Sequence, residues 1–384
     1  MQPRFYPSCE REIIEIVSNA LCSGDRLTIA GGGSKQQIGR SVDCSLISLG
    51  HLNGVMDHDP AELVLTARPG TPLKEIEALI AGERQMLAFE PYDHAPIFGG
   101  VPGTATIGGI FAAAVAGSRR LTAGRARDHL LGVRAISGQG ELFISGAKVV
   151  KNVTGFDLPK LLAGSWGRLG IITELTMKLL PRPETTATCL VMGLDPSAAI
   201  GAMAKAMGSQ ADVSCAAYRP SSAKQTAICA FRVEGFAPSV ESRCGKLHAL
   251  LAGHGEIVRA GQREADAFWG DMRSLASLPI SSPLWRVNLP PSNAPSFLHD
   301  VAAEPGQYLM DWAGGLIWLA TPCPAECVRA AAGRRGGHAM LIRADVGTRR
   351  DVDAFHPQPP GLAALEERVR RAFDPDSIFE TGRF

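Results

Sequence analysis

The segment Pro102-Gly103-Thr104-Ala105-Thr106-Ile107-Gly108-Gly109 is the most informative stretch of this sequence. It combines a flexible glycine backbone with small side chains, so a flat ring system can lie against the main chain with backbone amides directed at its edge. A close-packed structural turn is the alternative interpretation of the same residues. An alanine-rich run follows, and we predict that it forms a helix ended by Gly117.

Two other glycine-rich corners lie on either side of this segment. The predicted strand Arg26 to Ala30 leads into Gly31-Gly32-Gly33-Ser34-Lys35, where backbone amides, a hydroxyl and a charge can surround a pyrophosphate. The later corner, residues 164–172 (GSWGRLGII), can offer backbone N–H and C=O groups to a purine. A surface turn and a helix-to-strand corner are the alternative interpretations. No Walker A loop and no G-x-G-x-x-G that opens a helix occur, so the usual nucleoside triphosphate and NAD signatures are missing.

Composition and charge exclude several classes of protein. A chain of 384 residues, 45% of them hydrophobic, is long enough for two domains. The 39 Lys and Arg residues nearly balance the 38 Asp and Glu residues, which argues against a nucleic-acid partner. The longest apolar run, Ile107 to Ala116, is shorter than the ~20 residues that a membrane-spanning helix needs. We therefore expect a globular protein without a transmembrane segment.

The cysteines bear on redox chemistry and on the cellular compartment. The nine cysteines are scattered, and no two of them form a C-x-x-C pair. Because iron–sulfur clusters and zinc sites need closely spaced thiolates or imidazoles, we predict neither of them and no other metal. Any electrons that this chain handles must then leave through another carrier. Residues Met1 to Arg11 lack the pattern of a secretion signal, so we expect a cytoplasmic protein.

Short apolar runs alternate with stretches of helical spacing, which predicts a mixed α+β or α/β organisation. Pro181-Arg182-Pro183 is a predicted domain boundary, because two prolines so close together interrupt both sheets and helices. Helices are expected at 13–21, 72–81 (with Thr71 as N-cap), 157–163, 197–207, 239–252 and 361–373. Strands are expected at 26–30, 63–67, 85–89, 130–137, 142–145, 171–180, 188–192 and 227–233.

The three glycine corners, in this order and at this spacing, resemble the FAD domain of the vanillyl-alcohol oxidase, or PCMH-type, family. The resemblance runs from about Arg26 to Pro183. It implies an α+β fold with a PCMH-type FAD-binding domain at 1–183, a second α/β cap domain at 184–345, and a C-terminal segment at 346–384 that returns to the FAD domain. The expected cofactor is therefore FAD.

Members of this family use the first corner for the pyrophosphate, the second for the flavin and phosphates, and the third for the adenosine. Asp128 matches a further landmark of the family. The resemblance implies these FAD-binding residues: Gly31, Gly32, Gly33, Ser34, Lys35, Pro102, Gly103, Thr104, Thr106, Ile107, Gly108, Gly109, Asp128, Gly167, Gly170, Ile171 and Ile172. Relatives with covalent flavin use a histidine or cysteine in particular loops. Residues 31–40 contain neither, so we expect non-covalent FAD.

Four shorter segments are similar to one branch of the family, the FAD-binding E subunits of glycolate oxidases. They are Phe89-Glu90-Pro91, Ala116 to Arg120, Lys151 to Asp157, and Lys178 to Pro183. The resemblance implies a complex with a second flavin subunit and an iron–sulfur subunit, which together oxidise the 2-hydroxy acid glycolate to glyoxylate. Membrane association would then arise through the partner subunits.

One departure from the family concerns catalysis. Relatives that oxidise D-2-hydroxy acids carry an H-x-G-D-G-N-x-H segment, and the nearest glycine-histidine piece here is Gly336-Gly337-His338. Oxidation of a hydroxy acid needs a base for the hydroxyl proton and a cation for the carboxylate. The candidates are His94, Arg125 and His338. Their alternative interpretations are solvated histidines and an Arg125–Asp128 pair.

Three functions remain compatible with these motifs. The first is an FAD-dependent subunit that oxidises the 2-hydroxy acid. The second is an assembly or electron-relay subunit of the same complex. The third is a stand-alone alcohol or sugar-lactone oxidase of the same fold.

Overall fold

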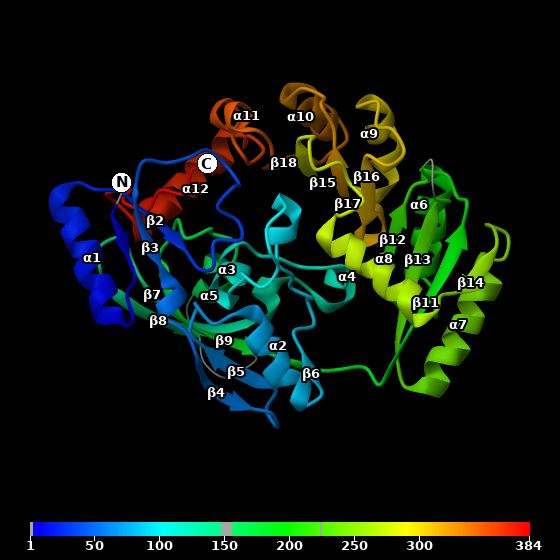
Figure 1. Ribbon diagram of the computed structural model, residues 1–384, viewed down its shortest axis with the longest axis horizontal. Coiled ribbons are helices and arrows are strands. Elements are labelled where there is room, and N and C mark those ends of the chain that lie inside the picture. Colours follow the sequence, from blue (N-terminus) through cyan, green and yellow to red (C-terminus); the bar gives the residue numbers. More distant parts are fainter. Residues whose placement is uncertain (1–2, 147–155, 223–224) are drawn as a thin grey trace.

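The computed structural model describes residues 3–146, 156–222 and 225–384, so residues 151–155 of one family-like segment lie outside the described residues. Two bodies of sheet and helix lie side by side in Figure 1. One is built from the N-terminal half of the chain and the other from residues that follow Pro183. The mixed helix and strand content agrees with the α+β class expected from the sequence.

The N-terminal body contains a five-stranded antiparallel sheet and a small parallel sheet. The larger sheet has the order β4 (Val55–Asp59), β5 (Val64–Ala67), β9 (Ile171–Lys178), β7 (Leu130–Ile136), β8 (Leu142–Gly146). The smaller one has the order β1 (Arg4–Phe5), β3 (Ser45–Ser48), β2 (Leu27–Ala30), and β6 (Gln85–Met86) pairs with β10 (Leu180–Pro181). The helices are α1 (Glu10–Ser23), α2 (Leu73–Gly82), α3 (Ile107–Ala112), α4 (Arg120–Ala123) and α5 (Leu158–Leu162).

The second body is one eight-stranded sheet, antiparallel at every pairing. Its order is β14 (Ile257–Arg259), β11 (Thr185–Met192), β13 (Ile228–Gly235), β12 (Val213–Arg219), β16 (Tyr308–Asp311), β17 (Leu316–Ala320), β15 (Leu284–Asn288), β18 (His338–Arg343). Its helices are α6 (Pro196–Met207), α7 (Ala237–Leu251), α8 (Gln262–Ser274), α9 (Ala294–Asp300) and α10 (Ala325–Arg334).

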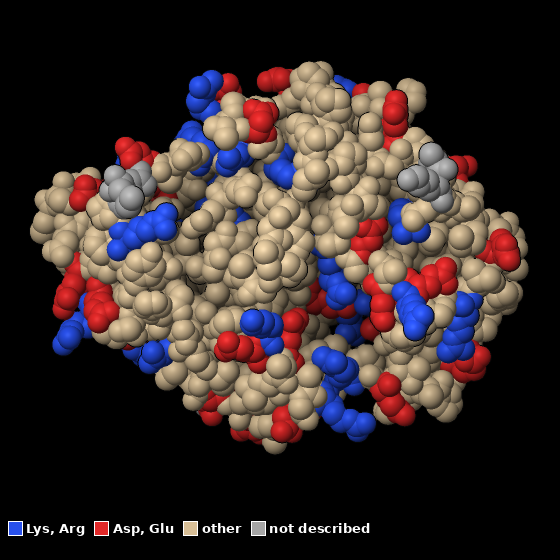
Figure 2. Space-filling view, viewed as in Figure 1, with Lys and Arg blue, Asp and Glu red and all other residues tan. Residues whose placement is uncertain are grey.

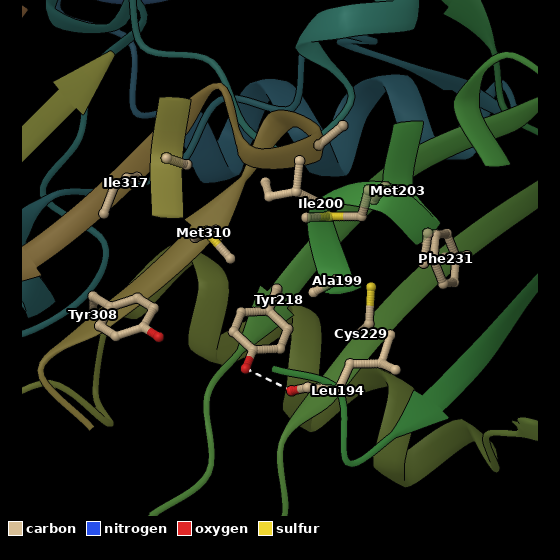
Figure 3. Packing of buried hydrophobic residues seen from close by; sticks show 14 of the residues in the cluster. Leu194, Ala199, Ile200, Met203, Tyr218, Cys229, Phe231, Tyr308, Met310 and Ile317 are labelled. Carbon is tan, nitrogen blue, oxygen red and sulfur yellow. Dashed lines mark hydrogen bonds between the residues drawn. The ribbon is translucent and has the colours of Figure 1, made fainter. Parts of the chain in front are cut away.

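Alternate residues of the long strands enter two different cores. Cys189 and Val191 pack with α6 and α7, whereas Leu190 faces the opposite core, which holds Trp269 of α8 and Ile97 of the N-terminal body. Figure 3 shows the first core, where the Tyr218 hydroxyl donates a 2.8 Å hydrogen bond to the carbonyl oxygen of Leu194. The second core therefore joins the two bodies.

The C-terminal segment contains α11 (Val346–Asp351) and α12 (Pro360–Phe373), and Figure 1 shows α12 beside the N-terminal elements. Beyond α12, Phe379 bridges to Leu27 of β2, and both side chains are buried with Ile13 and Val17 of α1. The end of the chain thus packs against its beginning.

Three local predictions were wrong. Thr71 does not cap α2, because its hydroxyl donates to the carbonyl oxygen of Arg68 at 2.7 Å and Pro72 occupies the N-cap position. The strand expected at 85–89 ends at Met86, since the chain turns away and Glu90 has a φ of 51°. The alanine-rich helix α3 ends at Ala112, where the left-handed Ala114 redirects the chain toward Gly117. The other helices and strands expected from the sequence are confirmed, within a few residues at their ends.

Candidate functional site

The three glycine corners meet around two adjoining pockets. The first pocket is bordered by Gly31 to Lys35, Thr106, Gly109 and Trp166. The second is bordered by Gly108, Gly167, Gly170 and Ile172, and it shares Ile29, Gly31, Gly109, Ala112 and Trp166 with the first. Segments more than a hundred residues apart in the chain thus form one continuous surface.

Close backbone packing explains why glycine occupies these corners. A Cβ atom at Gly32 would overlap the carbonyl oxygen of Thr104, and one at Gly108 would lie 2.5 Å from Cβ of Pro69. Asp93 fixes the same loop, because its carboxylate accepts hydrogen bonds from the amides of Gly103 at 2.7 Å and Thr104 at 2.9 Å. The first two corners are therefore in direct contact and leave no room for side chains.

Two buried cations border the first pocket. The Lys35 side chain is 8% exposed and donates to the hydroxyl of Ser34 at 3.3 Å, and burial lowers its pKa to about 8. The Arg383 side chain is 9% exposed, and burial lowers its pKa to about 10. Neither cation has a carboxylate within ion-pair distance in the described part of the chain. Because buried charges need a counter-charge, these residues fit a bound diphosphate.

A cavity of about 280 Å³ adjoins the first pocket at Ala113 and Trp166 and lies between the two bodies. Its wall includes Tyr92, His94, Ala113 to Ala116, Arg120, Arg125, Arg127, Arg286, Met340 and Phe355. Four of these residues are arginines and none is a carboxylate. By contrast, basic and acidic side chains are interspersed over the molecular face in Figure 2. The cavity is thus selectively positive, which favours an anionic ligand.

His94 is a buried histidine that borders this cavity. Its ring stacks on Tyr92 with centroids 4.8 Å apart, and its buried Nδ1 has no partner among the described residues. Burial, followed by the positive charge of Lys35, holds the pKa of His94 well below its usual range. The imidazole is therefore neutral near pH 7, which is the form that can accept a proton.

The remaining predicted residues lie in varied positions. Arg125 borders the cavity but is exposed, and His338 is an exposed residue at the start of β18 that does not border it. Asp128 borders none of these pockets, and its carboxylate accepts the Arg125 amide at 2.8 Å. Ile107 and Ile171 are core residues. Pro102, Gly103 and Thr104 belong to the loop held by Asp93, outside the first two pockets.

Sequence reasoning missed several residues of this site. Arg383 and Arg286 reach it from the last residues of the chain and from β15, where no motif marks them. Trp166 borders both pockets and the cavity. It lies inside a predicted glycine corner, but nothing in the sequence indicated that its side chain contacts a ligand. Its left-handed backbone, with a φ of 57°, is visible only in the structure.

Comparison with known proteins defines the class. Residues 2–146 match the family described as "FAD binding domain". The whole fold is similar to the solved structure of alkyldihydroxyacetonephosphate synthase, with a TM-score of 0.69 and 14% identity over 98% of this chain and 76% of that chain. This chain is therefore a flavoprotein with a PCMH-type FAD-binding domain, as the resemblance implied.

Relatives of similar sequence identify the branch of the family to which this chain belongs. The chain is 34% identical to glycolate oxidase subunit GlcE of Escherichia coli (strain K12) over 373 residues, which cover 97% of this chain and 96% of the relative. The chain belongs to the family of GlcE subunits. Glycolate oxidase subunit GlcD of Bacillus subtilis (strain 168) is 33% identical over 142 residues, or 37% of this chain and 28% of that protein.

The described helices and side-chain clusters bear on membranes and metals. Over residues 3–146, 156–222 and 225–384, every helix is too short or too polar to cross a membrane. Within the same ranges no group of three or more His, Cys, Asp or Glu side chains is arranged to hold a metal ion.

Proposed function

We propose that this chain is the FAD-binding subunit of a glycolate oxidase, an oxidoreductase that converts glycolate to glyoxylate and passes the electrons to an iron–sulfur partner subunit. Its membership of the GlcE family supports this function. The observation that carries it is a glycine-walled pocket, in which the buried Lys35 and Arg383 have no ion-pair partner among the described residues, directly beside an arginine-lined cavity.

In this proposal FAD is held without a covalent bond. Lys35, Arg383 and the amides of the first corner would hold the diphosphate, Gly108, Gly167, Gly170 and Ile172 the adenosine, and Ala113 to Ala116 the flavin side. No cysteine borders these pockets in the part of the chain that the structure describes. Bound FAD would supply the hydride acceptor of the reaction.

The protein side chains would then bind the acid and move its proton. The half-buried arginines of the cavity attract the carboxylate, and His94, which borders the cavity, accepts the hydroxyl proton. The positive charges of Lys35 and Arg286 disfavour protonation of His94 before the acid binds.

The finer organisation belongs to the same proposal. We divide the chain into an FAD domain at 1–183, a cap at 184–345, and a segment at 346–384 that completes the FAD domain. The partners are a second flavin subunit and an iron–sulfur subunit, and the complex is cytoplasmic, with membrane contact through those partners.

A second candidate function is an electron relay within the complex, with oxidation occurring on another subunit. It is favoured by the missing H-x-G-D-G-N-x-H segment and by the exposed position of His338 outside the cavity.

Absorbance spectroscopy of the purified full chain loaded with FAD tests both candidates. Glycolate should bleach the flavin absorbance of the isolated chain if this subunit oxidises the acid. Bleaching that needs the partner subunits supports the relay instead. A chain that retains no FAD under any condition would overturn the proposed function.

A further inference from the structure

Two arginines of the cavity lie close to the aromatic ring of Trp312. The Arg120 guanidinium lies 4.0 Å from the ring centroid and that of Arg286 lies 5.1 Å from it. Both distances lie within the range of cation–π attraction. Arg120 comes from α4 of the N-terminal body and Arg286 from β15 of the other body. The Trp312 ring therefore contacts one cation from each of the two bodies.

Trp312 is itself firmly fixed. Its indole Nε1 donates a 2.9 Å hydrogen bond to the carbonyl oxygen of Gly117, which crosses between the two bodies. The preceding carboxylate, Asp311, accepts a 2.7 Å hydrogen bond from the Ser118 hydroxyl beside it. Trp312 and Ala313 both have left-handed backbones, with φ of 52° and 53°. Such strain at two successive residues that are not glycine is typical of functional sites.

No carboxylate forms an ion pair with either arginine in the described part of the chain, although Asp128 favours the charged form of Arg120 from a distance. Both Arg120 and Arg286 are half-buried. Burial, then the charges of Arg125 and Arg286, lower the pKa of Arg120 to about 10. Two like charges held together on one ring repel each other unless an anion lies beside them. Arg127 differs, since Asp128 lies 3.7 Å from it.

We infer that Arg120 and Arg286 form a clamp for the carboxylate of a 2-hydroxy acid, with Trp312 as the positioning residue that holds both guanidinium groups at the cavity wall. This inference rests on the proposed function and assigns its carboxylate site. It replaces the exposed Arg125, which the sequence suggested for this role. Because each arginine comes from a different body, the bound acid also links the two bodies.

Titration of the FAD-loaded full chain with oxalate tests the clamp, because oxalate is an unreactive carboxylate whose binding perturbs flavin absorbance. Calorimetry of the same titration gives a reading independent of the flavin. Arg286→Gln and Arg120→Gln should each weaken oxalate binding roughly 10- to 100-fold, as expected for the loss of a charge-assisted hydrogen bond. Arg350→Gln should leave the affinity within about twofold, because this exposed arginine pairs with Asp351 and does not border the cavity.

Trp312→Phe tests the positioning role. It keeps an aromatic ring but loses the bond to Gly117 and part of the cation–π attraction, so binding should weaken roughly 3- to 10-fold. Adding Trp312→Phe to Arg286→Gln should weaken binding by less than the product of the single effects, because the ring acts through the arginines. The matched control is Trp285→Phe, since Trp285 is also buried and lies 5.6 Å from the guanidinium of Arg329, but its side chain does not border the cavity.

Several outcomes would overturn the clamp. They are oxalate affinity unchanged in Arg286→Gln, a loss as large in Trp285→Phe as in Trp312→Phe, or wild-type protein that holds FAD but binds no oxalate. A chain that takes up no FAD at all would instead overturn the proposed function. If Trp312→Phe failed to fold, the comparison of Arg120→Gln and Arg286→Gln with Arg350→Gln would still decide whether the clamp exists.

Discussion

The guanidinium of Arg383 donates a 3.1 Å hydrogen bond to the carbonyl oxygen of Lys35, a residue 348 positions earlier in the chain. Nearby, the Arg40 amide donates to the carbonyl oxygen of Gly382 at 2.7 Å. The last residues therefore form one wall of the pocket that the first glycine corner begins. Binding of the proposed cofactor depends on the C-terminal segment as well as on the glycine motifs.

Replacing Arg383 by glutamine should weaken FAD binding. The change removes a buried charge and its bond to Lys35, which corresponds to roughly a 10- to 100-fold loss of affinity. Quenching of flavin fluorescence during titration of the apoprotein measures it. Arg350→Gln is the control, because this exposed arginine of α11 pairs with its neighbour Asp351 and does not border the pocket. Equal FAD affinity in both variants would contradict the role of Arg383.

Gly32→Ala should abolish FAD retention. The new methyl group would overlap the carbonyl oxygen of Thr104 and separate the first two corners. The ratio of flavin to protein absorbance after purification measures retention. In the control Gly245→Ala, the added Cβ in α7 meets no atom within 4 Å, so we expect full retention and up to ~1 kcal/mol of added stability. Full retention of FAD by Gly32→Ala would contradict the prediction.

FAD affinity should fall as the pH rises above about 8. Burial lowers the pKa of Lys35 to about 8, so the free protein loses this proton near that pH. A bound diphosphate stabilises the charged amine and raises the pKa again. Between about pH 8 and pH 10 binding therefore takes up a proton and weakens with rising pH. Lys35→Met should bind FAD more weakly at pH 7 and lose this pH dependence. A wild-type protein whose affinity for FAD does not change over this pH range would refute the prediction.

Arg232→Leu should destabilise the protein by about 3–5 kcal/mol. Arg232 of β13 lies 2.6 Å from the Glu90 carboxylate of the N-terminal body and 3.6 Å from Glu234, and all three side chains are largely buried. Its removal leaves Glu90 without a counter-charge. Urea unfolding of the FAD-loaded chain measures the loss, and the double variant Arg232→Leu with Glu90→Leu should recover part of it. A loss below about 1 kcal/mol would contradict the prediction.

Flavin reduction by glycolate should stay constant as the pH falls from about 8 to about 6. Burial and the charge of Lys35 keep the pKa of His94 well below its usual range, so the imidazole remains neutral and able to accept a proton. Stopped-flow absorbance of the complex measures the rate, and His94→Asn should slow it roughly 100-fold or more. A wild-type rate that halves near pH 6.5 would show that the base has an ordinary histidine pKa.

Local signals predicted much of the fold. Helix α1 ends where Gly24 adopts a left-handed φ of 74°, and the hairpin of β7 and β8 turns at Gly140 with a φ of 76°. Strand β9 alternates between buried and half-buried residues over its second half, as its period-two pattern indicated. The errors at Thr71 and Gly117 have one cause. Both residues form hydrogen bonds with backbone groups that are distant in the sequence, Thr71 with Gly54 and Gly117 with Phe89. Local secondary-structure propensity does not predict such hydrogen bonds.

The sequence by itself determined the glycine corners, because close backbone approach excludes every side chain and therefore leaves a visible pattern of residues. Only the tertiary structure decided that Lys35 meets Arg383, and that Arg120 and Arg286 share the Trp312 ring. The sequence alone does not distinguish an arginine in a solvated loop from an arginine in a buried site. Its role depends on which distant residues surround it, and chain packing alone sets that environment.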